Sequence, residues 1–261
     1  IRFGLGGIKG VGDTAVEAIV NARDKGGKFK DVFDFFERVN LSSCNKKAIE
    51  SLVYGGAFDN IGGITREQFF ATGKKGTTMI EVLMRYGNMY QESKSSMQNS
   101  LFGDMGVEIQ KPTIDKAAPW DNLYKLRNEK DVVGMYISAH PLDSYRVLLK
   151  AMNATNISEL QNNEEFLAKY APGTNLNFGG IVTSSEEKIG MKSGKPYIVM
   201  EVEDFSGSHS FTIAGKLFPV YRNMFLANSF VLISGEIKER YQRKEDKDAG
   251  KPVEYSFSIN K

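Results

Sequence analysis

A glycine-containing turn near the start of the sequence has the composition of a phosphate-binding site. Lys9-Gly10-Val11-Gly12-Asp13 stands before apolar residues at positions 16, 19 and 20, a spacing that predicts a helix. Such a turn points several backbone N–H groups toward one place beside the positive end of the helix, and glycine lets a phosphate approach closely. The alternative is an ordinary helix start that Asp13 caps.

A second glycine turn follows a second predicted helix. Residues 45–53 have a helical pattern, Lys46 and Lys47 stand near its start, and Gly55 and Gly56 follow it. A paired, degenerate turn would place two phosphate-binding positions on one compact helical unit. The alternative is that the lysines belong to an ordinary solvated helix face.

A polar segment in the middle of the chain carries two adjacent large apolar residues. Positions 91–100 offer almost nothing to bury, and this stretch is too polar to fold alone. It runs into Gln98-Asn99-Ser100-Leu101-Phe102. We expect Leu101 and Phe102 to fill a pocket on a partner protein, with the amide of Gln98 hydrogen-bonded at its edge. The alternative is that both side chains fold back onto the helical unit.

The C-terminal third switches to the two-residue period of β-strands. Five strands are predicted at 176–188, 197–205, 208–214, 230–241 and 253–259, with turn residues between them. Apolar residues in the interval 217–226 have helical spacing. Five strands with a helix between the third and fourth are typical of the oligonucleotide/oligosaccharide-binding barrel, the OB-fold.

The loops of this predicted barrel are the basic part of its surface. Lys188, Lys192 and Lys195 lie in the loop between the first two strands, where OB-folds commonly bind ligands. Glu201 and Glu203 share one face of the second strand and would repel a phosphate chain. These residues therefore predict only weak, salt-sensitive binding of single-stranded nucleic acid.

The elements that must position these residues divide into four segments. Residues 1–73 form a helical unit, 74–119 a flexible linker that contains the 98–102 motif, 120–173 a helical connector, and 174–261 the barrel. The predicted fold class is therefore α+β and multidomain, with an all-α N-terminal domain and a five-stranded C-terminal barrel.

Composition narrows the class of protein further. The chain has 261 residues, of which 41% are hydrophobic and 25% charged, values typical of a globular protein. No apolar run reaches the length of a membrane span, and a single cysteine and two histidines cannot build a Cys/His zinc site. The cysteine usage fits a cytoplasmic protein. The net charge of +2 means that contacts with nucleic acid must come from local geometry. The start at Ile1 is that expected of a fragment.

An ordered set of motifs resembles one protein family. The first turn resembles a helix-hairpin-helix motif, which grips the DNA backbone without reading sequence. The whole set is similar to the region of bacterial replicative polymerases, the DNA polymerase III alpha subunits, that follows their catalytic domain. The matching motifs are FGL at 3–5, IKGVG at 8–12, FDF at 33–35, NK at 45–46, GAFD at 56–59, Glu129, VGMYIS at 133–138, HPLD at 140–143, GGIV at 179–182, KSGKP at 192–196 and EDFSG at 203–207.

The resemblance implies a division of roles along the chain. The hairpins would bind duplex DNA, residues 98–102 would grip the ring-shaped sliding clamp, and the barrel would contact single-stranded template or another replisome subunit. The family's polymerase chemistry uses paired aspartates that hold two magnesium ions, and it lies upstream. This chain would therefore be a DNA- and clamp-binding tail that carries no catalytic residues, cofactor or membrane contact of its own.

Two other classes of protein fit less well. The tail of an NAD-dependent DNA ligase also combines an OB-fold with helix-hairpin-helix units, but that family has the reverse order and a four-cysteine zinc module. A stand-alone OB-fold protein that binds single strands or tRNA would not need the long helical region before the barrel.

Overall fold

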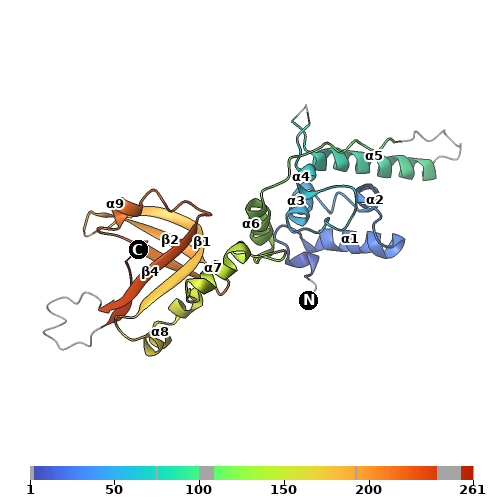
Figure 1. Ribbon diagram of the computed structural model, residues 1–261. Coiled ribbons are helices and arrows are strands. Elements are labelled where there is room, and N and C mark those ends of the chain that lie inside the picture. Colours follow the sequence, from blue (N-terminus) through green and yellow to red (C-terminus); the bar gives the residue numbers. More distant parts are fainter. Residues whose placement is uncertain (1–2, 74–75, 100–108, 192, 240–253, 261) are drawn as a thin grey trace. The chain divides into compact units, whose positions relative to one another are not determined.

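The fold is described from a computed structural model that covers residues 3–73, 76–99, 109–191, 193–239 and 254–260 (Figure 1). The chain separates into two compact units, Ile1–Ala139 and His140–Lys261. The first is helical and the second is built around a β-sheet. Each is described by itself.

The first unit begins with a short 3-10 turn, Leu5–Gly7, followed by helices α1 to α6. Polar side chains fix several of the helix starts: the carboxylate of Asp31 accepts from the Asp34 N–H (2.8 Å) before α2, and Asn45 accepts from the Ala48 N–H (3.0 Å) before α3. The helices are α1 (Asp13–Gly26), α2 (Val32–Arg38), α3 (Lys46–Tyr54), α4 (Arg66–Phe69), α5 (Met79–Asn99) and α6 (Asn122–Val133).

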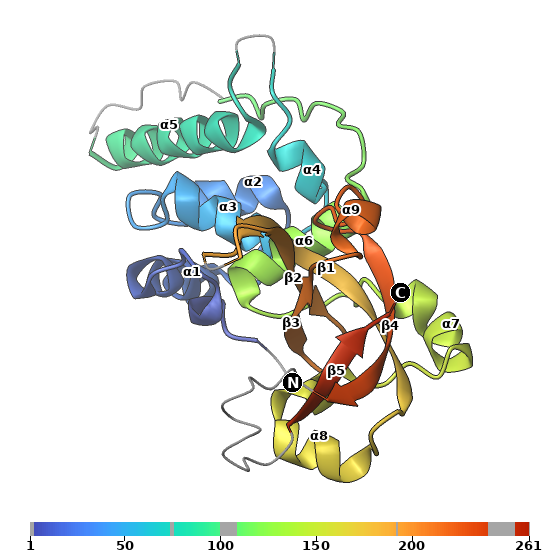
Figure 2. The same ribbon diagram turned by 90° about the vertical axis from the view of Figure 1, so that its left-hand side faces the viewer.

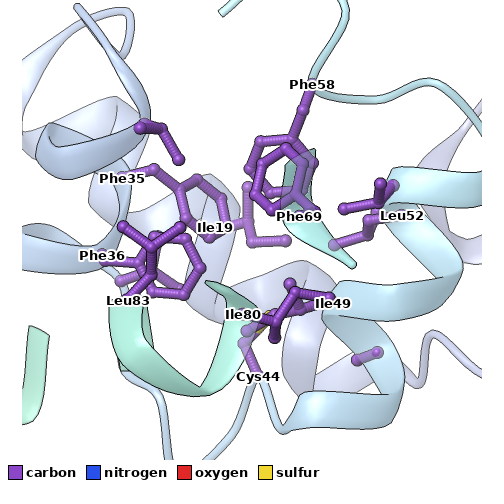
Figure 3. Close-up of a cluster of buried hydrophobic side chains, with 14 of the residues drawn as sticks. Ile19, Phe35, Phe36, Cys44, Ile49, Leu52, Phe58, Phe69, Ile80 and Leu83 are labelled. Carbon is purple, nitrogen blue, oxygen red and sulfur yellow. The ribbon is translucent and has the colours of Figure 1, made fainter. Parts of the chain in front are cut away.

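Apolar faces of these helices meet in one core (Figure 3). Phe35 makes edge-on ring contacts with both Phe36 and Phe58, at centroid distances of 5.4 and 4.9 Å. Cys44 is a free thiol buried in the same core, and burial raises its pKa to about 11. Other labelled members are Ile19, Ile49, Leu52, Phe69, Ile80 and Leu83, which come from α1, α3, α4 and α5.

The segment 74–119 differs from the flexible linker that the sequence predicted. Residues 79–99 form helix α5, whose first half contributes Ile80 and Leu83 to the core. The side-chain amide of Gln91 donates to the carbonyl oxygens of Phe36 (2.9 Å) and Val39 (2.8 Å) at the end of α2. Once this anchored part is helical, each further residue adds a hydrogen bond at little cost in free energy, so a polar sequence can continue the helix.

The predicted connector 120–173 is also divided differently. Helix α6 belongs to the first unit, where Trp120, just before it, stacks on Tyr54 of α3 at a centroid distance of 5.8 Å. The later helical elements belong to the second unit: the 3-10 turns Asp143–Tyr145 and Ile157–Gln161, and helices α7 (Arg146–Ala151) and α8 (Asn163–Lys169).

The second unit contains the five predicted strands (Figure 2). They are β1 (Asn175–Ile189), β2 (Pro196–Glu203), β3 (Ser208–Ile213), β4 (Phe230–Glu239) and β5 (Tyr255–Ile259). They form one curled sheet in the order β3-β2-β1-β4-β5, in which every neighbouring pair is antiparallel. This sheet confirms the α+β class and is consistent with an OB-like barrel.

Alternation within the strands builds the barrel core. In β2, Ile198, Met200 and Val202 are buried, whereas the residues between them are half-buried. The predicted helix 217–226 is shorter than expected. Helix α9 covers only Phe218–Tyr221, and a turn follows it in which the Met224 N–H donates to the carbonyl of Tyr221 three residues back (2.9 Å).

Candidate nucleic-acid interface

The first glycine turn has an open, uncapped helix start. Gly12 is the residue before α1, with extended backbone (φ −80°, ψ 163°), and it offers no side chain to cap the helix. Asp13 is the first helical residue and therefore does not cap α1. The Ala15 N–H donates to the Gly12 carbonyl (3.0 Å), and the residue before the helix offers no side chain to the N–H groups of Asp13 and Thr14. Asp13 is the one acidic group in this first turn.

Buried residues and backbone hydrogen bonds fix this turn on the helical unit. Val11 is only 6% exposed and lies in the core, as does Ile8. The Lys9 N–H donates to the carbonyl of Val132 in α6 (2.7 Å), and the Val11 N–H donates to the carbonyl of Ile8 (3.0 Å). Lys9 and Gly12 are exposed. The turn therefore presents its glycines to solvent on a fixed base.

Helix α3 flanks the same turn and explains why residue 10 is glycine. Gly10 has φ +91°, a conformation that side chains rarely adopt. A Cβ at this position would also lie 2.8 Å from the Ser51 hydroxyl and 3.9 Å from Cε of Lys47. The exposed Lys47 side chain therefore lies beside the first glycine turn, and not beside the second turn with which the sequence analysis grouped it.

Lys46 has a different environment. Its ammonium group pairs with the carboxylate of Glu81 in α5 (2.9 Å) and, more loosely, with Glu50 (3.8 Å). Hydrogen bonds from Lys46 and from the Thr78 N–H lower the pKa of Glu81 to about 2. The pair ties α3 to α5.

The second glycine turn is filled by the protein itself. A Cβ on Gly55 would lie 3.2 Å from Ile8 and 3.6 Å from Val133, so Gly55 permits close packing. Gly56 has φ +77° and faces the guanidinium of Arg66, which donates to Asp59 (2.8 Å) and to the Tyr54 carbonyl (3.1 Å). The Arg66 side chain occupies the position where a phosphate was expected.

A buried ion pair next to this turn was missed by the sequence analysis. Glu129 of α6 is 1% exposed and lies 3.6 Å from the guanidinium of Arg66. It also accepts from the N–H groups of Ile137 (3.0 Å) and Ser138 (2.7 Å) and from the Ser138 hydroxyl. In the sequence, Glu129 stands out only as part of a family motif. Its position on the apolar side of a predicted helix could have indicated the ion pair, because a buried carboxylate needs a partner.

The barrel loop places its lysines near solvent. Lys188 is half exposed and pairs with Glu186 (3.0 Å), and Lys195 is exposed. Lys192 lies outside the described residues. On β2, Glu201 accepts from the Ser208 hydroxyl (3.1 Å), so this carboxylate is held on the strand face as expected.

Asp204 has a structural role that the sequence did not reveal. It is 7% exposed, and it accepts from the N–H groups of Ile157 (2.8 Å) and Ser206 (2.7 Å). It therefore shapes the β2–β3 turn and joins the 3-10 turn Ile157–Gln161 to the barrel. Within the parts of the chain that the structure describes, no group of three or more His, Cys, Asp or Glu is arranged to hold a metal ion.

The predicted docking motif begins at the end of α5. The backbones of Gln98 and Asn99 belong to the last turn of that helix, and Ser100, Leu101 and Phe102 lie outside the described residues. Among the helices that are described, none is long and apolar enough to cross a membrane.

Comparisons with known proteins agree with the motifs. A family model described as a helix-hairpin-helix motif matches residues 1–69. The DNA polymerase III subunit alpha of Neisseria meningitidis serogroup A is 30% identical over 237 residues, which cover 91% of this chain and 19% of the relative. That of Pasteurella multocida is 28% identical over 241 residues (91% and 19%), and that of Mycobacterium tuberculosis H37Rv is 27% identical over 248 residues (93% and 20%).

The chain thus spans about a fifth of the length of these relatives. Its N-terminal part carries a helix-hairpin-helix motif, and over more than nine tenths of its length the chain is related to the DNA polymerase III alpha subunits.

Proposed function

We propose that this chain is the DNA-binding and clamp-tethering region of a bacterial replicative DNA polymerase. In this proposal the turn at residues 9–13 grips the backbone of duplex DNA without reading its sequence. Residues 98–102 dock on the sliding clamp, and the barrel contacts single-stranded template. The polymerase relatives and the helix-hairpin-helix motif support the DNA-binding role most directly.

The open start of α1 is the observation that carries this role. Gly12 offers no side chain to the N–H groups of Asp13 and Thr14, and a Cβ there would meet nothing within 4 Å. Lys9 and Lys47 are exposed near this position. Backbone N–H groups at a helix start favour an anion, and two lysines beside it add attraction for a phosphate chain.

Three residues of the two predicted phosphate-binding turns, Lys46, Gly55 and Gly56, are not part of the proposed phosphate contact. Lys46 pairs with Glu81, Gly55 packs against Ile8, and Gly56 faces the guanidinium of Arg66. Their interactions within the unit account for these residue types. The contact therefore consists of Lys9, Gly10, Val11, Gly12 and Asp13 together with Lys47.

Gly12→Val tests the DNA-binding role. The side chain would project into open space in the free protein, so the variant should fold, but it would block the approach of a phosphate. We expect duplex affinity to fall by about 1–3 kcal/mol, equally for duplexes of unrelated sequence, because backbone contacts carry no base information. Fluorescence anisotropy with two such duplexes measures this.

Gly62→Val is the matched control. Gly62 is an exposed glycine of the same unit whose Cβ would also meet nothing within 4 Å. It should leave DNA affinity unchanged. A folded Gly12→Val protein that binds duplex DNA as tightly as the control would contradict the proposal.

Polymerase activity is proposed for the whole protein that contains this region. The relatives are named as subunits of DNA polymerase III, and the chain corresponds to about a fifth of them. Paired aspartates elsewhere in that protein would hold the two magnesium ions. Primer extension should therefore require the full-length protein with magnesium, and the region described here should extend no primer alone.

A further inference from the structure

The barrel has a seam between its two end strands. In the sheet order, β3 and β5 are the terminal strands (Figure 2). Within residues 208–213 and 254–260, both of which the structure describes, no backbone hydrogen bond joins one strand to the other. A groove of about 980 Å³ lies between them, with Leu160, Asn163 and Phe166 along one part of its wall.

The strand directions determine what can close this seam. Every neighbouring pair in the sheet is antiparallel, so β3 and β5 both run parallel to β1 and to each other. Direct pairing of β3 with β5 would be parallel, which is slightly less stable per residue. One added strand between them can be antiparallel to both. It would continue the alternation around the barrel and satisfy the free backbone groups of two edges at once.

The side chains along the seam indicate what such a strand would carry. Tyr255, Phe257 and Ile259 alternate along β5 and pack against the barrel core, yet all three are only half-buried. The ring of Phe257 lies 4.9 Å from that of Phe178 and 6.4 Å from that of Phe211. Apolar side chains at alternate positions of an added strand would complete this cover.

The charges on the described residues of the seam do not favour a nucleic-acid strand. Among those that line the groove, Lys238 and Glu239 are the charged ones, and the β4–β5 loop 240–253 lies outside the described residues. The ammonium group of Lys238 is paired with Glu236 (2.6 Å) and bonded to Asn260 (3.2 Å). A phosphate backbone needs several available cations, whereas a peptide strand needs backbone donors and acceptors.

We propose that the seam between β3 and β5 binds an extended segment of a partner protein as a sixth, antiparallel strand with apolar residues at alternate positions. A strand of six residues occupies on the order of 1,000 Å³ at ordinary strand and sheet spacings, which matches the groove. This inference is independent of the proposed DNA contact at α1.

The test uses the whole chain and a synthetic peptide, acetyl-Ser-Val-Ser-Phe-Ser-Val-Ser-amide. Backbone amide exchange is measured with and without the peptide. We expect exchange to slow at amides in both 208–213 and 255–259. The same peptide N-methylated at alternate residues loses the N–H donors that face one of the two edges, and its affinity should be at least about tenfold lower. Neither comparison depends on whether a variant folds.

Three results would overturn the inference. The first is no slowing in either strand at millimolar peptide, and the second is equal affinity for the N-methylated peptide. The third is protection of both edges by oligo(dT) but not by the peptide, which would assign the seam to nucleic acid. A Phe257→Ser variant adds a fourth comparison, since loss of this ring should weaken peptide binding while leaving the duplex affinity of the first unit unchanged.

Discussion

Two glycines in one turn meet different demands, and substitutions should separate them. Gly10 has φ +91°, and a Cβ there would lie only 2.8 Å from the Ser51 hydroxyl, which is less than van der Waals distance. Gly12 has extended backbone, and a Cβ there would meet nothing within 4 Å. Gly10→Ala should therefore destabilise the helical unit by about 1–3 kcal/mol, and Gly12→Ala should change its stability far less. Urea unfolding measures both, and equal stabilities would show that the Gly10 conformation is not required.

Glu129 should be among the residues on which the first unit depends most. Replacing it with alanine leaves the buried Arg66 without this carboxylate and the N–H groups of Ile137 and Ser138 without their acceptor. We expect a loss of about 3–5 kcal/mol in the free energy of unfolding. Glu92→Ala, on the exposed side of α5, is the control and should cost little. Similar losses in the two variants would show that the buried pair contributes nothing specific.

The sequence predicts local structure well only where neighbours along the chain decide it. A local pattern of glycines before a helix is sufficient to predict the turn at 9–13 and the start of α1. Gly56 has a similar local pattern, but Arg66, ten residues later, fills its turn. Such an intramolecular occupant is a tertiary contact, and spacing along the chain does not reveal it.

At the scale of elements, the strands were predictable and α5 was not. Alternation in β2 arises from one buried face, so the pattern survives in the sequence. The second half of α5 has no comparable pattern, because it is helical by extension from a part packed on α2. The end of α9 is also a local feature, the turn in which the Met224 N–H donates to the Tyr221 carbonyl, that no periodicity encodes.

The contact between α3 and α5 should depend on pH. The pKa of Glu81 is about 2 in the folded unit against 4.5 for its ordinary value, so folding favours the ionised carboxylate. Its contribution to stability is therefore complete above about pH 4.5 and is lost as the pH falls through about 2. Glu81→Gln should be less stable than wild type at pH 7, and the difference should disappear near pH 2.

Urea unfolding between pH 7 and 2 follows this difference. Glu92→Gln, on the exposed side of α5, serves as the control. A Glu81→Gln protein with the same acid profile as wild type would mean that the Lys46–Glu81 pair does not stabilise the folded unit.

The loop between β1 and β2 should bind single strands by charge alone. Replacing Lys188, Lys192 and Lys195 with alanine should lower the salt dependence of oligo(dT) binding by roughly two to three counterions. Titrations at several salt concentrations measure the slope. An unchanged slope would show that these lysines do not contact the nucleic acid.

At the scale of the whole molecule, residues 98–102 should act as a tether of modest affinity. Full burial of Leu101 and Phe102 contributes about 1.5–3 kcal/mol each, and ordering of the segment opposes it. We expect micromolar binding to the clamp, about −8 kcal/mol. Such strength is sufficient for a clamp that encircles DNA, because effective concentration keeps the two proteins together.

Leu101→Ala combined with Phe102→Ala should abolish clamp binding and leave duplex affinity intact. Calorimetry with the clamp, and separately with duplex DNA, measures the two activities. Met89→Ala is the control, since Met89 is a half-exposed apolar residue of α5 outside the motif. Clamp binding by the double variant at wild-type strength would show that the motif is not the contact.

The hydrogen bonds of Gln91 to the end of α2 have a consequence for direction as well as stability. They fix the rotation of α5 about its own axis, so the direction of its last turn, which ends at Asn99, is set with respect to the rest of the first unit. Inserting one alanine after Lys94 would turn everything beyond it by about 100° and advance it by about 1.5 Å. Inserting seven would add nearly two whole turns and restore the angle. Clamp binding that fails with one added residue and returns with seven would show that the rotation of α5 orients the motif for the clamp.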